Sequence, residues 1–189
     1  MTGIDASAEH PAFREEVFGP AMATTALPGD AAEFLQAAVD FANERLYGTL
    51  SVNLIVHPAT AKQLADQLDR AIAGLRYGGI GINVWVGAAF LLARATWGAY
   101  PGHTYTDVQS GIGVVHNALM FDKPQKTVVF APFRPFPRSV VHRELTLFPK
   151  PPWFLTNKTS QSTARRLTEF AADPNAKRLP ALFASALRG

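Results

Sequence analysis

Residues 49–86 read TLSVNLIVHPATAKQLADQLDRAIAGLRYGGIGINVWV, and they carry the clearest fold signal in the chain. Residues 49–56 and 80–86 are apolar and often β-branched, which is typical of strands covered on both faces in a parallel sheet. The spacing of the leucines and alanines between them predicts a helix over 60–75. Strand, helix and strand with short connections predict an α/β fold in which the two strands are parallel neighbours.

The residues before this stretch extend the same alternation. Asp30 and Glu33 have the spacing of a capping box, which predicts the start of a helix over 31–47. Residues 17–27, VFGPAMATTAL, predict a further strand in front of that helix. We therefore expect a parallel-sheet lobe with both helices packed on its strands.

The residues after it are less regular. Residues 97–113, WGAYPGHTYTDVQSGIG, contain four Gly and one Pro without periodicity, and such long ordered loops are usually functional. Residues 126–133 predict a strand whose pairing is limited by the prolines that follow. Two short helices are expected over 160–172 and 179–188, within an extended, Pro-rich C-terminal tail.

Composition narrows the possible functions. With 189 residues, 48% of them hydrophobic and 17% charged, the chain can bury one sizeable core. The absence of Cys excludes a disulfide framework, a thiolate zinc site and a cysteine nucleophile within these residues. No apolar run reaches the roughly 18 residues of a membrane span, and no signal peptide is recognisable, so we expect a soluble, cytoplasmic chain without a membrane partner.

The charge is unevenly distributed. Residues 123–189 hold twelve Lys or Arg against three Asp or Glu, whereas residues 1–122 hold six against twelve. The basic residues are scattered among Pro and Phe instead of forming a cluster, which disfavours nucleic acid as a partner. We expect the basic tail to dock against an acidic surface of the same assembly.

Several segments, in order, resemble one enzyme family. REEVFGP at 14–20 resembles the Glu-Glu-hydrophobic-Phe-Gly-Pro motif of NAD(P)-dependent aldehyde dehydrogenases. The family's later segments find counterparts in FANERLYGTLSVNLIV, LRYGGIGINVWV, TWGAYPGHT and QKTVVF. The resemblance covers about residues 13–131, and the family's Gly-Tyr-Lys-x-Ser-Gly loop is replaced here by AYPGHTYTDVQSG.

This resemblance implies a C-terminal portion of such an oxidoreductase, which converts an aldehyde to a carboxylic acid with NAD or NADP. Residues 13–122 would be a partial catalytic domain, and 123–189 an oligomerisation strand with a basic C-terminal tail. The family's Cys nucleophile, general-base Glu and nucleotide-binding domain precede the motif, so the chain alone is expected to be inactive and to bind little or no cofactor. Its expected partners are the upstream region of the same enzyme and a second copy, joined through 126–133.

The resemblance also assigns roles to three residues. Glu16 would accept hydrogen bonds from the hydroxyls of the nicotinamide ribose, Phe18 would pack beside the nicotinamide, and Trp97 would line the aldehyde channel. A solvated carboxylate and a core Phe are the alternatives for the first two. His103 and Asp107 could relay protons, and the five His show no spacing typical of a metal site.

Two other classes of function remain open from the sequence. The chain could be a non-catalytic binding or assembly module that keeps the fold without the chemistry. It could also bind nucleic acid or another anionic surface through its basic tail.

Overall fold

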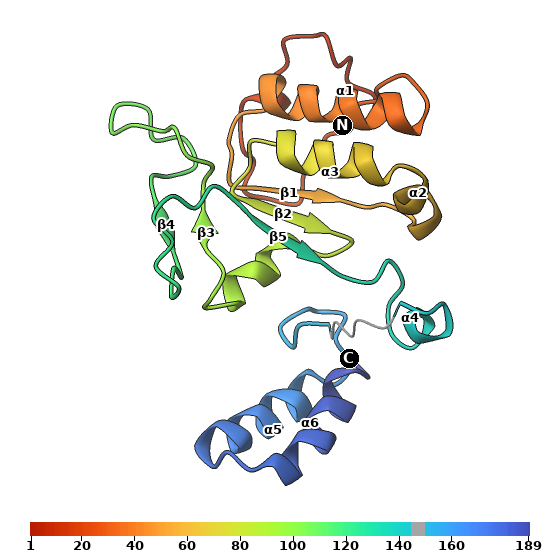
Figure 1. Ribbon diagram of the computed structural model, residues 1–189, viewed down its shortest axis with the longest axis vertical. Coiled ribbons are helices and arrows are strands. Elements are labelled where there is room, and N and C mark those ends of the chain that lie inside the picture. Colours follow the sequence, from red (N-terminus) through yellow and green to blue (C-terminus); the bar gives the residue numbers. More distant parts are fainter. Residues whose placement is uncertain (145–149) are drawn as a thin grey trace. The chain divides into compact units, whose positions relative to one another are not determined.

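The chain forms two compact units, Met1–Phe130 and Ala131–Gly189, in the computed structural model, which describes residues 1–144 and 150–189. The first unit contains a parallel sheet with helices, so the fold is mixed α/β (Figure 1). The boundary lies after residue 130, whereas the sequence placed it after residue 122. Among the described residues, no helix is long and apolar enough to cross a membrane.

The main sheet has three parallel strands in the order β1-β2-β5. They span Ser51–Leu54, Gly79–Ile82 and Thr127–Phe130. The prediction that 49–56 and 80–86 contain parallel neighbours is confirmed, although each strand is shorter than expected. A second, two-stranded antiparallel sheet pairs β3 (Trp97–Gly98) with β4 (Val114–Val115).

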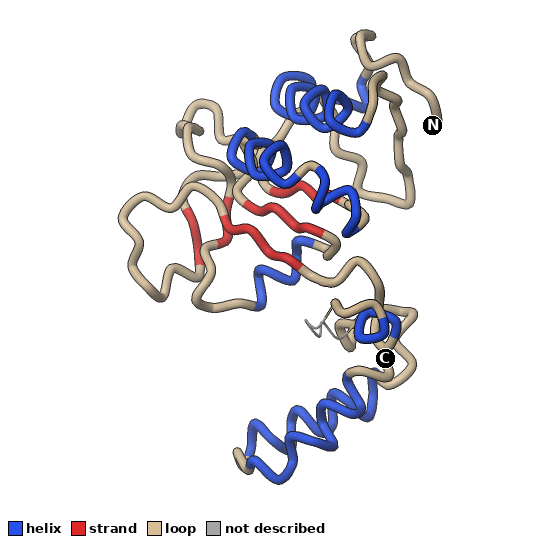
Figure 2. The backbone as a smooth tube through the Cα atoms, turned by 45° about the vertical axis from the view of Figure 1, so that its right-hand side comes forward, coloured by secondary structure: helices blue, strands red, loops and turns tan. Residues whose placement is uncertain are grey.

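Helices cover both faces of the main sheet. Helix α1 (Ala31–Arg45) and helix α3 (Ala65–Gly74) lie on one face, and the 3-10 helix η2 (Val86–Leu91) lies on the other (Figure 2). The capping box at the start of α1 is present: Asp30 Oδ1 accepts the backbone N–H of Glu33, and Glu33 Oε2 accepts the backbone N–H of Asp30.

The helix expected over 60–75 is broken into two pieces. Helix α2 (Pro58–Gln63) begins two residues earlier than expected, where the His57 ring accepts the N–H of Ala59 at 3.2 Å. Leu64 then leaves the helical conformation, with φ −109° and ψ 31°, and α3 starts at Ala65. The continuous helical prediction was therefore wrong at Leu64.

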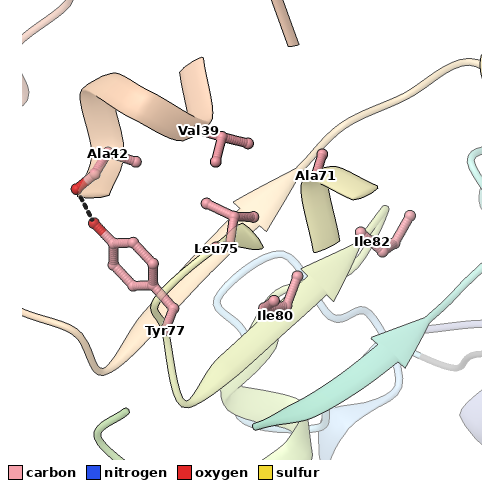
Figure 3. Packing of buried hydrophobic residues seen from close by; sticks show 7 residues of the cluster. All are labelled: Val39, Ala42, Ala71, Leu75, Tyr77, Ile80 and Ile82. Atoms are coloured by element: carbon pink, nitrogen blue, oxygen red, sulfur yellow. Dashed lines mark hydrogen bonds between the residues drawn. The ribbon is translucent and has the colours of Figure 1, made fainter. Parts of the chain in front are cut away.

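The core lies between β2 and the two long helices. Ile80 and Ile82 turn toward α1 and α3, where they meet Ala71 and Leu75 (Figure 3). Beside them the Tyr77 hydroxyl donates to the carbonyl of Ala42 at 2.9 Å, and burial raises the pKa of this phenol.

The other face of β2 is lined by glycines. A Cβ on Gly79 would lie 2.9 Å from Val86 Cγ2, and one on Gly81 would lie 2.5 Å from Val84 O. The chain therefore ends β2 at Ile82, reverses at Asn83 (φ 59°) and passes closely beneath its own strand. This reversal is why the strand expected over 80–86 stops early.

The strand expected over 17–27 does not form. Only Thr25 makes a single β-bridge, with Ile4, and Phe18 and Met22 are 93% and 77% exposed. Residues 22–25 bond to the N-terminus instead, since Ile4 N donates to Thr24 O at 2.9 Å and Thr24 N to Met1 O at 3.0 Å. A short 3-10 turn, η1 (Pro11–Phe13), precedes the segment.

Strand β5 is fixed to α3 by the residue before it. Lys126 Nζ donates to the carbonyls of Ile72, Ala73 and Leu75 at 3.1, 2.8 and 2.6 Å, where α3 ends. Burial lowers the pKa of this ammonium group. The strand expected over 126–133 thus covers Thr127–Phe130 and pairs with β2 of the same chain.

Among its described residues, the second unit contains helices and no strand. Helix α5 (Ser160–Ala172) matches the expected range 160–172, and α6 (Leu179–Ala186) ends two residues before the expected 188. The two helices pack through buried hydroxyls, with Ser185 Oγ 2.9 Å from Thr163 Oγ1. The unit's helices are α4 (Arg138–Val141), α5 (Ser160–Ala172), η3 (Ala176–Arg178) and α6 (Leu179–Ala186).

Candidate functional site

The loop over 97–113 is fixed to the sheet through one residue, Thr49, which immediately precedes β1. The Thr49 carbonyl accepts the N–H of Tyr100 at 3.1 Å, and its hydroxyl lies 2.6 Å from His103 Nε2. Its own N–H donates to Ser110 Oγ at 2.8 Å. Every polar group of Thr49 therefore holds the loop at the amino edge of the sheet.

Glycines allow three backbone segments to cross at this edge. A Cβ on Gly78 would lie 1.8 Å from Gly98 O, and a Cβ on Gly98 would lie 2.4 Å from Gly113 O. Any side chain at Gly78 or Gly98 would force these backbones apart, since real Cβ atoms do not approach other atoms so closely. The β3–β4 pair is thereby stacked directly against the start of β2 (Figure 1).

An aromatic cluster surrounds Trp97 on β3. The rings of Trp97 and Phe90 meet edge-to-face with centroids 5.8 Å apart, and Phe90 meets His116 in the same way at 4.7 Å. His116 has a positive φ of 61°, which is unusual for a residue with a side chain. Its Nε2 is buried and has no hydrogen-bond partner among the described residues.

A polar cavity of about 290 Å³ lies beside the loop. Its wall includes His103 and Asp107 from the loop and Arg76, two residues after the end of α3. His103 is turned toward Thr49, and Asp107 Oδ2 accepts Gln109 Nε2 at 2.9 Å. The two residues that could form a proton relay thus share one cavity, while each holds a different hydrogen-bond partner.

An apolar cavity of about 400 Å³ lies between α1, β1 and the helices α2 and α3, whose Ala61 and Leu68 also line it. The face of α1 that carries Phe34 and Leu35 lines one wall, and the length of β1 lines another. Among the described residues, no strand pairs with the outer edge of β1.

The three residues assigned from the sequence are not brought together. Glu16 and Phe18 are exposed in a segment without helix or strand, and Trp97 is half-buried on β3. Within the part of the chain that the structure describes, no hydrogen bond or ring contact joins Glu16 or Phe18 to Trp97. The described residues also contain no group of His, Asp or Glu side chains that could hold a metal ion.

Three residues of the site carry no signal in the sequence that singles them out. Thr49 is one of many threonines, and its role depends on contacts with residues more than fifty positions away. Phe90 and His116 follow apolar runs and would pass for ordinary core residues. The tertiary structure brings Phe90 into contact with both Trp97 and His116.

Comparisons of this chain with protein-family models, with curated proteins and with solved structures find no match.

Proposed function

We propose that this chain is the C-terminal portion of an aldehyde dehydrogenase-like oxidoreductase that converts an aldehyde to a carboxylic acid with NAD or NADP. The proposal rests on the ordered motifs between residues 13 and 131 and on the α/β lobe that they form. The observation that carries it is the aromatic cluster of Trp97, Phe90 and His116. In this proposal the cluster supplies apolar surface to the aldehyde channel, to which the resemblance assigns Trp97.

The thiol nucleophile has to come from another region, because this chain contains no Cys. In the complete enzyme that thiolate would attack the aldehyde carbonyl, and NAD(P)⁺ would supply the hydride acceptor. Hydrolysis of the resulting thioester would release the carboxylic acid and return the thiol. In this scheme the present chain supplies groups that bind and orient.

Glu16 and Phe18 are the residues that would meet the cofactor. The Glu16 carboxylate is exposed and can accept hydrogen bonds from both ribose hydroxyls, and charged acceptors form the stronger bonds. Phe18 offers an exposed ring to the nicotinamide. One ribose contact does not replace phosphate and adenosine sites, so we expect weak NAD binding by the isolated chain.

The experiment joins this chain to the region encoded upstream of it in the same frame and follows NADH formation from an aldehyde. We expect turnover from the joined protein and none from the present chain. Glu16→Gln should raise the KM for NAD⁺, with Glu15→Gln as the matched control, because adjacent side chains in an extended segment point to opposite sides. An upstream region without Cys, or equal behaviour of the two Glu variants, would contradict the proposal.

A non-catalytic assembly module is the second candidate. The outer edges of β1 and β5 lack strand partners among the described residues, and open edges are surfaces that proteins usually cover. In the same experiment, a joined protein that assembles stably but never forms NADH would favour this function.

A further inference from the structure

The polar cavity beside the loop over 97–113 has no role in the proposed function. Its described wall includes neither Glu16 nor Phe18, and none of the aromatic cluster around Trp97. Its volume of about 290 Å³ lies at the low end of the range for ligand pockets, so it fits one small molecule. The chemistry of such a molecule follows from the charged and polar side chains of the wall.

One part of the wall carries a positive charge, on Arg76. Its backbone N–H donates to Asn43 Oδ1 at 2.8 Å, and its Nη2 donates to Asn43 O at 3.2 Å and to the Glu44 carboxylate. Among the described residues, Nε and Nη1 of Arg76 have no hydrogen-bond partner. The pair with Glu44 is partly exposed, at 46% and 69% of the two side chains, and exposed pairs are weak. The guanidinium group is therefore available to a further carboxylate, which it binds well because its N–H groups form a planar fork.

The loop contributes a negative charge to the same cavity, on Asp107. The backbones of Asp107 and Thr104 exchange two hydrogen bonds, at 3.0 and 3.2 Å, and Asp107 Oδ2 accepts Gln109 Nε2 at 2.9 Å. These contacts position both side chains and leave Asp107 Oδ1 and Gln109 Oε1 without a hydrogen bond among the described residues. Two acceptors, one of them charged, match the N–H groups of an ammonium ion.

Two more side chains of the wall, His103 and Tyr100, can both donate and accept. His103 Nε2 lies 2.6 Å from Thr49 Oγ1, which fixes the ring and leaves Nδ1 without a partner in the described part of the chain. The Tyr100 ring lies 5.4 Å from Lys126 Nζ, and no hydrogen bond is described for its hydroxyl. Each of these side chains is thus positioned by one contact and keeps one polar atom for a ligand. A site positioned in advance loses less entropy on binding.

We propose that this cavity binds a small zwitterion, a molecule that carries one carboxylate and one ammonium group. The carboxylate bonds to Arg76 and the ammonium group to Asp107 and Gln109, so each charge of the ligand meets one of opposite sign. A simple anion would share the cavity with the carboxylate of Asp107, and a simple cation with the guanidinium of Arg76. Both arrangements bring like charges together, which costs affinity. Free amino acids belong to the ligand class that avoids this cost.

The test is a titration of the full chain followed through its backbone amide signals by NMR. The probes are glycine, β-alanine and γ-aminobutyrate, which differ only in the number of methylene groups between the two charged groups. We expect at least one probe to shift the signals of Arg76 and of residues 100–109 saturably, with a Kd of about 1 mM or tighter. Propionate and propylamine carry a single charge each, and they should bind at least tenfold more weakly.

Two variants that remove a charge separate the two ends of the site. Asp107→Asn should weaken binding of the preferred amino acid at least tenfold, and it should not weaken binding of propionate. Arg76→Gln should weaken binding of both. Asp122→Asn and Arg70→Gln make the same changes at exposed positions outside the described wall, and should bind as the unmodified chain does. The amide spectrum shows directly whether each variant is folded, and retained binding of propionate shows that Asp107→Asn leaves the site intact.

Each outcome decides the proposal. The absence of a saturable shift at residues 100–109 with all three amino acids would overturn it. Propionate that binds as tightly as the amino acids would also overturn it, because the cavity would then be a site for simple anions. Unchanged binding of the amino acids by Asp107→Asn would do the same, since the ammonium group would then have no role. These measurements involve neither NAD nor an upstream region, so they are independent of the test of the proposed function.

Discussion

The hydroxyl of Thr49 lies 2.6 Å from Nε2 of His103, and this contact joins the start of β1 to the middle of the long loop. Together with the bonds from Tyr100 N and to Ser110 Oγ, it makes one threonine the attachment point of residues 97–113. Because the loop begins at Trp97, the position of the aromatic cluster depends on Thr49.

Thr49→Val should weaken the attachment of the loop over 97–113 without changing the volume of the side chain. The substitution keeps the shape and removes the hydroxyl, and loss of one hydrogen bond at a half-buried site costs about 1–2 kcal/mol. We expect a lower midpoint in urea and faster proteolysis within 97–113. Thr104→Val is the control, because the Thr104 hydroxyl contacts only exposed Thr106. Equal stability of the two variants would contradict the role of Thr49.

Gly98→Ala should be strongly destabilising. The added Cβ would lie 2.4 Å from Gly113 O and 3.0 Å from Val114 Cα, and both are backbone atoms that cannot move without separating β3 from β4. We expect a loss of about 2 kcal/mol or more in the free energy of unfolding, measured by denaturant titration. Gly74→Ala, in helix α3, is the matched control, because the added Cβ would meet only Val39 Cγ1, at an ordinary contact distance of 3.6 Å. The control should be neutral or slightly stabilising.

Lys126→Met should weaken the attachment of β5 to α3. The side chain keeps most of its length but loses the three bonds to the carbonyls of Ile72, Ala73 and Leu75. Bonds from a charged donor contribute about 1.5–3 kcal/mol, partly offset here by the desolvation that lowers the pKa of Lys126. Thermal unfolding should therefore shift to lower temperature, whereas Lys123→Met, at an exposed position, should leave it unchanged.

The second unit should lose stability in acid through Glu144. Burial raises the pKa of this carboxyl, but hydrogen bonds from the Arg134 side chain and from Phe133 N and Arg134 N outweigh it, so the pKa is lowered. A carboxyl with a lowered pKa in the folded state stabilises the fold above its unfolded pKa, and this contribution disappears as the pH falls through the folded value. Unfolding followed between pH 7 and pH 3 should show this loss in the unmodified chain and a flatter profile in Glu144→Gln. Parallel profiles would exclude this role of Glu144.

Self-association through β5 is testable by light scattering. Thr127 N donates to Gly78 O, so Val128 turns its backbone groups to the outer edge. Val128→Pro should therefore dissociate an oligomer that pairs through this edge, and it should leave the pairing of β5 with β2 intact. Val129→Pro removes a donor on the inner side and should unfold the sheet instead. A monomer at every concentration and salt, unchanged by Val128→Pro, would refute the pairing.

The elements of regular structure followed from local patterns. The capping box at Asp30 and Glu33 predicted the start of α1, and the apolar runs predicted β1 and β2 as parallel neighbours. The break at Leu64 and the reversal at Asn83 were missed, because both occur inside runs with uniform helical or strand character. The strand over 17–27 was expected and did not form, since those residues bond to the N-terminus.

The sequence by itself determined α1, α5, α6 and the parallel pairing of β1 with β2, because these depend on periodicity and on nearby capping residues. The tertiary structure alone decided the site. Thr49 meets His103 and Ser110, and Phe90 meets Trp97 and His116, at an edge where Gly78 and Gly98 let backbone segments pass close to one another. Contacts between residues so far apart in the chain depend on how the elements pack, and a local sequence pattern does not predict that packing.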